Sequence, residues 1–260
     1  MQNMTTSTFV FMVLMLLAGC KSEGAFIPAD ATLIEVTVTP SPIYVLEGRE
    51  LQLIATAKYD DESEKDVTNS VTWEIIGDPT IAKVTASGLL TGNIRGNTEL
   101  TASKDGITSN IENVNVCNLA DACIDIFNTG SGKLFTSSPS VDYLDRIGGS
   151  ATNGPYTETY GASGSYYIFD WDNADALCAT YNTNSIGGRN NWRLAEINEL
   201  ENELFDVYGD MTAARGWPNS KFYWSATPDV TNYYALDLYF GTVVSGTTNS
   251  LAYVSCVSDP

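Results

Sequence analysis

The 260-residue chain is long enough for one large domain or two small ones, and its 43% hydrophobic content can supply their cores. Its formal net charge of -19 repels phosphate backbones and anionic lipid surfaces, which argues against a nucleic-acid partner. Histidine is absent, so the chain contains no Ser-His-Asp or Cys-His catalytic site, and zinc enzymology is disfavoured.

The first residues have the pattern of an export signal. Residues 9–17 are almost entirely apolar, a run too short to span a bilayer but typical of a signal-peptide core. The run ends in Leu17-Ala18-Gly19-Cys20, which resembles the bacterial lipobox. That resemblance implies a lipoprotein signal peptide over residues 1–19 and a lipid on Cys20, and Lys21 after the cysteine favours the outer membrane over the inner membrane. Whether the protein faces the cell surface or the periplasm stays open at this point. Because no Lys or Arg precedes Cys20, an ordinary signal peptide or an uncleaved anchor stays open.

The composition of residues 20–31 predicts a short polar tether, and the pattern of residues 32–116 predicts an all-β domain. Apolar and polar side chains alternate along residues 33–39 and again along residues 50–59, as they do in half-buried strands. Shorter β-like runs follow at residues 71–75, 81–84, 98–102 and 111–116. About seven short strands separated by Gly-containing turns predict a β-sandwich.

A series of motifs makes this domain more specific. Val38-Thr39-Pro40, Glu47-Gly48, Asp66-Val67-Thr68, Val71-Thr72-Trp73 and Ala86 to Gly92 occur in the order seen in group 2 bacterial Ig-like domains. The region therefore resembles the modules of intimin- and invasin-type adhesins. The resemblance implies an Ig-like sandwich that serves as a spacer, with Trp73 as a core anchor. We interpret the acidic residues 60–62 as a solvated hairpin tip, with a calcium site as the alternative.

The five cysteines fit an oxidising compartment. If Cys20 carries a lipid, four remain for disulfides. Cys117 and Cys123 are close enough in sequence to close a short loop, and Cys178 with Cys256 would then close a long one. Other pairings of the four stay open at this point.

Residues 117–260 predict a second, mixed domain. Residues 166–169 read as a strand, and Asp170 or Asp172 can cap a helix that runs to about Tyr181. The stretch Asn191 to Leu200 is predicted to open a second helix over residues 193–208. Its stripe of Ile197, Leu200, Leu204 and Val207 would face the core, its acidic residues would be solvated, and Gly209 would end it. A loop over residues 210–222 and four β-like runs complete the domain, at residues 222–226, 233–239, 242–244 and 251–257.

This layout resembles a C-type-lectin-like fold. The matching motifs are Trp171 to Cys178, Trp192-Arg193-Leu194, Tyr223 to Thr227 and Tyr253 to Val257, which follow the order seen in the C-terminal domain of bacterial collagen-like adhesins and invasin-type tips. The resemblance implies two helices flanking a twisted antiparallel sheet, with Cys178 bonded to Cys256. The predicted fold class is thus mostly β with an α+β C-terminal domain. The calcium-dependent sugar motifs of lectins are absent from the sequence, so we expect calcium-independent binding and no metal or cofactor.

Together these features predict a lipid-anchored surface adhesin that presents a lectin-like tip on an Ig-like spacer. Its partner would be a host or neighbour-cell surface protein or glycan. We expect the contact in the 210–222 loop, through Arg215, Trp217 and Asn219, because Trp and Arg are enriched in binding hot spots. The alternative for Trp217 is a core plug. A structural envelope or biofilm-matrix lipoprotein is the second hypothesis, and a carbohydrate-active or formylglycine-generating-like enzyme the third.

Overall fold

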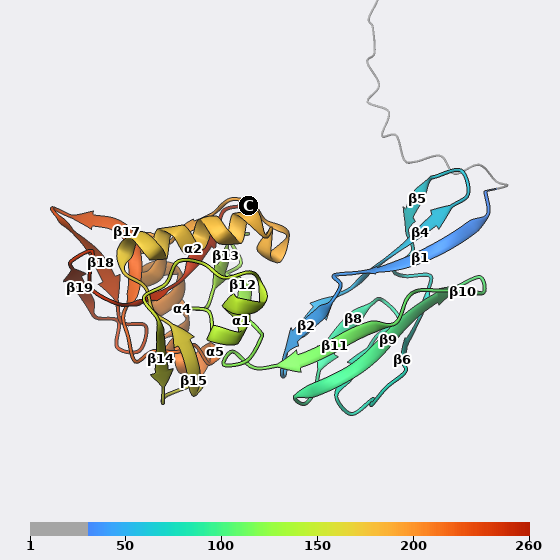
Figure 1. Ribbon diagram of the computed structural model, residues 1–260, viewed down its shortest axis with the longest axis horizontal. Coiled ribbons are helices and arrows are strands. Elements are labelled where there is room, and N and C mark those ends of the chain that lie inside the picture. The colour runs from blue at the N-terminus through green and yellow to red at the C-terminus, as the bar shows by residue number, and fades with distance from the viewer. Residues whose placement is uncertain (1–30) are drawn as a thin grey trace, which may run out of the picture.

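The computed structural model describes residues 31–260 and shows two domains that meet at Cys117 (Figure 1). The predicted signal peptide, the lipidation site Cys20 and nearly all of the tether lie outside the described residues. No helix in residues 31–260 combines the length and the apolar character needed to cross a bilayer.

The N-terminal domain is built from β-strands alone. Its strands are β1 (Leu33–Thr39), β2 (Ile43–Leu46), β3 (Glu50–Gln52), β4 (Ile54–Tyr59), β5 (Glu64–Asp66), β6 (Thr72–Ile75), β7 (Ala82–Val84), β8 (Leu89–Gly92), β9 (Gly96–Lys104), β10 (Ile107–Thr108) and β11 (Glu112–Cys117). They form the sheets β1-β4-β5, β3-β8-β7 and β10-β9-β11-β2, the last with β6 beside β9. Inward side chains such as Val36, Leu53, Leu90 and Val114 make one shared core.

Strand alternation in this domain follows the prediction with one exception. Val36 and Val38 are buried, but Ile34 is 51% exposed because a bulge between Leu33 and Glu35 shifts the pairing of β1 with β4. The acidic residues 60–62 lie at the exposed tip of the β4–β5 hairpin. Trp73 packs against the core and donates its indole N–H to the Thr68 carbonyl at 3.0 Å.

The C-terminal domain mixes strands and helices. Its strands are β12 (Ile126–Asn128), β13 (Leu134–Thr136), β14 (Pro155–Glu158), β15 (Gly164–Tyr167), β16 (Trp192–Leu194), β17 (Tyr223–Asp229), β18 (Asn232–Leu236), β19 (Val243–Gly246), β20 (Tyr253–Val254) and β21 (Cys256–Ser258). Its helices are α1 (Val141–Arg146), α2 (Trp171–Thr183), the 3-10 turn η1 (Ile186–Gly188), α3 (Ile197–Glu199), the π-helix η2 (Leu200–Phe205), α4 (Asp206–Tyr208) and α5 (Met211–Arg215).

Two four-stranded sheets, β12-β13-β21-β16 and β19-β18-β17-β20, form the body of this domain, and the long helix α2 packs beside them (Figure 1). As predicted, Asp170 caps α2 by accepting the Asn173 amide at 2.9 Å. Leu177 and Cys178 lie on the buried face of the helix. The disulfides pair Cys178 with Cys256 and Cys117 with Cys123, so the first bridge joins α2 to the last strand. The predicted fold class is confirmed: mostly β, with an α+β C-terminal domain.

The predicted helix over residues 193–208 begins later than expected. Trp192-Arg193-Leu194 form strand β16, whose residues pair with β21, and the helical segment begins at Ile197. The π-helix η2 changes the helical phase, so Leu200 and Leu204 are buried while Val207 turns outward and is 62% exposed. The first residues of the stretch therefore belong to the sheet and not to the helix.

Candidate functional site

The two domains contact each other through side chains. Leu46, at the end of β2, packs against the core of the C-terminal domain. The guanidinium of Arg146 lies 3.9 Å from the ring centre of Tyr44, a cation–π contact across the junction. An ion pair joins Arg95 to Asp121. The junction is therefore packed on both sides of the boundary at Cys117.

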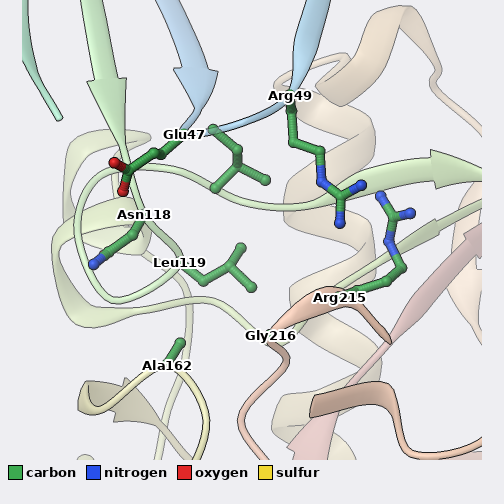
Figure 2. Close-up of a pocket in the computed structure, with 8 residues that line it drawn as sticks. Glu47, Arg49, Asn118, Leu119, Ala162, Arg215 and Gly216 are labelled. Atoms are coloured by element: carbon green, nitrogen blue, oxygen red, sulfur yellow. The ribbon is translucent and has the colours of Figure 1, made fainter. Parts of the chain in front are cut away.

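A cleft of about 190 Å³ opens at this junction (Figure 2). Its walls come from both domains and consist of Leu46, Glu47, Arg49, Asn118, Leu119, Ala162, Arg215 and Gly216. Figure 2 shows the guanidinium groups of Arg49 and Arg215 entering the same part of the cleft, while the Glu47 carboxylate points away from them. Two like charges thus share one small space, which costs electrostatic energy unless an anion or water lies between them.

Arg215 is held in place by buried groups. It is the last residue of α5, a short helix capped by Asp210 and ended by Gly216 in the left-handed conformation that favours glycine. Its Nη2 donates to Asp125 at 2.7 Å, its Nε donates to the same carboxylate, and its guanidinium stacks 3.9 Å from the Phe127 ring centre. Nη1 has no hydrogen-bond partner among residues 31–260, so it can donate into the cleft.

Arg49 faces it from the N-terminal domain, just before β3. Its side chain is exposed and makes no ion pair or hydrogen bond within the part of the chain that the structure describes. The backbone amides of Glu47, Arg49 and Gly216 all donate to carbonyls, at 2.9, 3.0 and 2.8 Å. The amides of these three residues are therefore not available to a ligand in the cleft.

The three residues predicted to contact a ligand do not form one surface. Arg215 lines the cleft, but Trp217 is fully buried and donates its indole N–H to Asp125 at 2.9 Å. The core-plug alternative therefore describes Trp217, because its ring cannot reach a ligand while the domain is folded. Asn219 contacts the protein and not the cleft, because its backbone amide donates to the Glu158 carboxylate at 3.1 Å and it does not line the cleft. Arg49, which the prediction missed, comes from the other domain and had no local signal beyond its charge.

Glu158 fixes the backbone of the 210–222 segment. Its carboxylate is 1% exposed and accepts from the Ser220 amide at 2.8 Å and from the Tyr253 hydroxyl at 3.0 Å. Burial opposes the charge, but the hydrogen bonds from Ser220, Tyr160 and Tyr253 outweigh it and hold the pKa of Glu158 below its ordinary value. An ionised carboxylate with every lone pair engaged is a structural anchor for this segment.

A second charged cluster surrounds Glu199, which the sequence placed in a solvated face. It is instead 7% exposed and pairs with Arg193 at 2.7 Å and Lys133 at 2.8 Å. Burial raises its pKa, but the hydrogen bonds from Arg193 and Lys133 prevail and lower the pKa of Glu199 to about 2. A general acid needs a raised pKa, so neither Glu199 nor Glu158 suits the acid role in glycoside hydrolysis. Within residues 31–260, no three His, Cys, Asp or Glu side chains lie close enough together to hold a metal ion.

Family models match both domains. Residues 34–111 match the group 2 bacterial Ig-like domain, and residues 148–258 match the Lcl C-terminal domain. A curated protein named Ice-binding protein 1, from Shewanella frigidimarina (strain NCIMB 400), is 29% identical over 188 residues. That alignment covers 70% of this chain, while the chain spans only 19% of the length of the relative.

Solved structures that overlay on the chain include two adhesins. The Yersinia pseudotuberculosis adhesin InvE aligns with 88% of this chain and 97% of its own, at 14% identity and a TM-score of 0.29. A C-terminal intimin fragment, solved in complex with the intimin-binding domain of the translocated intimin receptor, aligns with 87% of this chain and 67% of its own, at 17% identity and a TM-score of 0.28. The family models, rather than these overlays, assign the two domains.

Proposed function

We propose that this chain, a group 2 bacterial Ig-like domain followed by an Lcl C-terminal domain, is an adhesin-like surface binding module. The Ig-like domain acts as the spacer, and ligand binding involves the C-terminal domain and its junction with the spacer. The partner is a protein or glycan on a host or neighbouring cell. The observation that carries the proposal is the cleft at the junction, to which both domains contribute and whose Arg215 wall is fixed by buried groups.

The two buried glutamates of the C-terminal domain support a binding role over a catalytic one. Glu158 and Glu199 have lowered pKa values and are engaged by donors, so neither is available to donate a proton near neutral pH. Within residues 31–260, the side-chain donors of the cleft that have no acceptor are those of Arg49, Arg215 Nη1 and Asn118, which are suited to holding a ligand. We therefore assign no catalytic residue to the described part of the chain.

The anchoring half of the proposal rests on the sequence. Cys20 carries the lipid, residues 1–19 are the signal peptide, and the protein sits on the outer membrane facing outward. Incorporation of an alkyne-labelled fatty acid in cells tests this directly. We expect label in the native chain and none in Cys20→Ala, and equal labelling of the two would refute the lipid anchor.

Binding is tested by passing the fluorescent full-length chain over immobilised cell-surface glycans and extracellular-matrix proteins, with calcium and with EDTA. We expect saturable binding to at least one surface, and no effect of EDTA because binding is calcium-independent. Ice belongs among the test surfaces because of the name of the Shewanella relative. No detectable binding to any of the surfaces would contradict the adhesin proposal and favour a structural envelope or matrix lipoprotein.

A further inference from the structure

We propose that the junction cleft binds the carboxylate of a single acidic sugar residue, held between Arg49 and Arg215. This inference deepens the proposed binding function and rests on it. It starts from the hydrogen-bonding capacity that the walls leave unused. The side chain of Arg49, the Nη1 of Arg215 and the side-chain amide of Asn118 have no acceptor within residues 31–260.

All three of these groups are donors. The Asn118 side-chain oxygen is already engaged, because it accepts the Ala120 amide at 2.9 Å and the Asp121 amide at 3.0 Å. The carboxylate of Glu47, the cleft's one acidic group, and the side-chain amide of Asn118 both point away from the arginines, so the two guanidinium groups are the donors that share one part of the cleft (Figure 2). A space lined by donors selects a ligand group that only accepts, and guanidinium groups match a carboxylate in both charge and geometry.

The charge balance also calls for one negative group. Asp125 neutralises Arg215 from behind, and it is 3% exposed, so it cannot swing into the cleft. Arg49 has no counter-ion within the described residues. One carboxylate would balance Arg49 and accept from Arg215 Nη1 as well. A polyanion is disfavoured because the chain as a whole carries a charge of -19.

Size and backbone geometry distinguish a sugar from a peptide end. At about 190 Å³ the cleft is smaller than the roughly 300 Å³ at which drug-sized sites begin, so it suits one ring at the end of a chain. Proteins that capture a peptide carboxylate use a nest of successive backbone amides, and here those of Glu47, Arg49 and Gly216 are occupied. The amides of Leu119 and Ala162 have no acceptor within residues 31–260, but these two residues are far apart in sequence and form no such nest. Leu46, Leu119 and Ala162 supply an apolar wall for the C–H face of a sugar ring.

The experiment is an NMR titration of the full-length chain with methyl β-glucuronide. The matched ligand is methyl β-glucoside, in which a neutral hydroxymethyl group replaces the carboxylate, and N-acetylglycine represents a peptide end. We expect the glucuronide to bind, with the glucoside and N-acetylglycine each at least about tenfold weaker, and the affinity to fall as salt is added. Equal binding of the glucoside would overturn the carboxylate assignment, and equal or tighter binding of N-acetylglycine would overturn the sugar assignment.

The variant is Arg49→Gln, because Arg49 supports no other group of the described fold. Lys83→Gln is its control, an exposed lysine on β7 of the same domain that makes no ion pair within residues 31–260. We expect the first to weaken glucuronide binding by about tenfold or more and the second to leave it unchanged. Unchanged binding by Arg49→Gln overturns the inference. If the native chain binds a surface in the screen and Arg49→Gln binds it equally well, the acidic-sugar inference fails while the binding function stands. If the glucuronide binds but the chain binds none of the surfaces, the adhesin proposal fails and the inference stands.

Discussion

Replacing Asp125 with Asn tests whether a buried ion pair fixes the cleft wall. Asp125 is 3% exposed and accepts from Arg215 Nη2 at 2.7 Å and from Trp217 Nε1 at 2.9 Å. The side chain of Arg215 is only 16% exposed, so loss of its partner leaves a largely buried charge unpaired. Breaking such a pair costs about 3 to 5 kcal/mol, and because Asn keeps the volume and one acceptor we expect about 3 kcal/mol.

The assay is urea unfolding followed by tryptophan fluorescence. Four of the five tryptophans lie in the C-terminal domain, so the signal reports mainly on that domain. The matched control is Asp121→Asn, which removes the partner of Arg95 in a pair whose side chains are 35% and 53% exposed. Screening by solvent should limit that loss to less than about 1 kcal/mol.

A double variant separates the ion pair from simple packing. In Asp125→Asn with Arg215→Met, no unpaired charge remains, so part of the stability lost in the single variant should return. If Asp125→Asn costs no more than Asp121→Asn, the cleft wall is not fixed by this pair. Strictly additive losses in the double variant would lead to the same conclusion.

Three further outcomes follow from the same structure. Replacing both Cys178 and Cys256 with serine should lower the unfolding free energy by about 4 kcal/mol, because the disulfide closes a loop of 78 residues. The loss would be measured as a lower urea midpoint, and an unchanged midpoint would contradict stabilisation by this disulfide. The folded-state pKa of Glu199 is about 2, below the 4.5 of a free glutamate, so its stabilising contribution is complete above about pH 4.5 and is lost as the pH falls toward 2. Urea midpoints between pH 6 and pH 2 should therefore fall less steeply in Glu199→Gln than in the native chain, and parallel curves would refute this. Val230 is 98% exposed and has a φ of 57°, a conformation that Asn tolerates better than a β-branched residue. Val230→Asn should therefore raise the thermal midpoint by the equivalent of about 0.5 to 1 kcal/mol. A lower midpoint in this variant would show that Val230 is not strained.

Sequence patterns predicted the elements whose cause is local. The alternation of Val36 and Val38 and the cap at Asp170 depend on neighbouring residues, and the structure confirms both. The errors arose where pairing partners or helix phase decide the outcome. Ile34 turns outward at a bulge that only the β1–β4 register reveals, and Val207 turns outward after a π-helix that periodicity cannot foresee.

The candidate site could be predicted only in part, because its residues are distant in sequence. The sequence indicates Arg215 through its residue type alone, because its partners Asp125 and Phe127 lie about 90 residues earlier in the chain. Arg49 belongs to the other domain, and nothing near it in the sequence indicates a cleft. The residue type of Trp217 suits a binding hot spot and a core equally well, and burial decides between the two roles.

The most direct test of the binding account is to map the ligand that the surface screen identifies onto the protein by NMR. Amide chemical shifts of the full-length chain would be compared with and without that ligand. The account predicts that the largest changes fall at residues 46–49, 118–119 and 215–216, on both sides of the junction cleft. Changes confined to the β17–β18 hairpin around Val230, with the cleft signals unmoved, would contradict it.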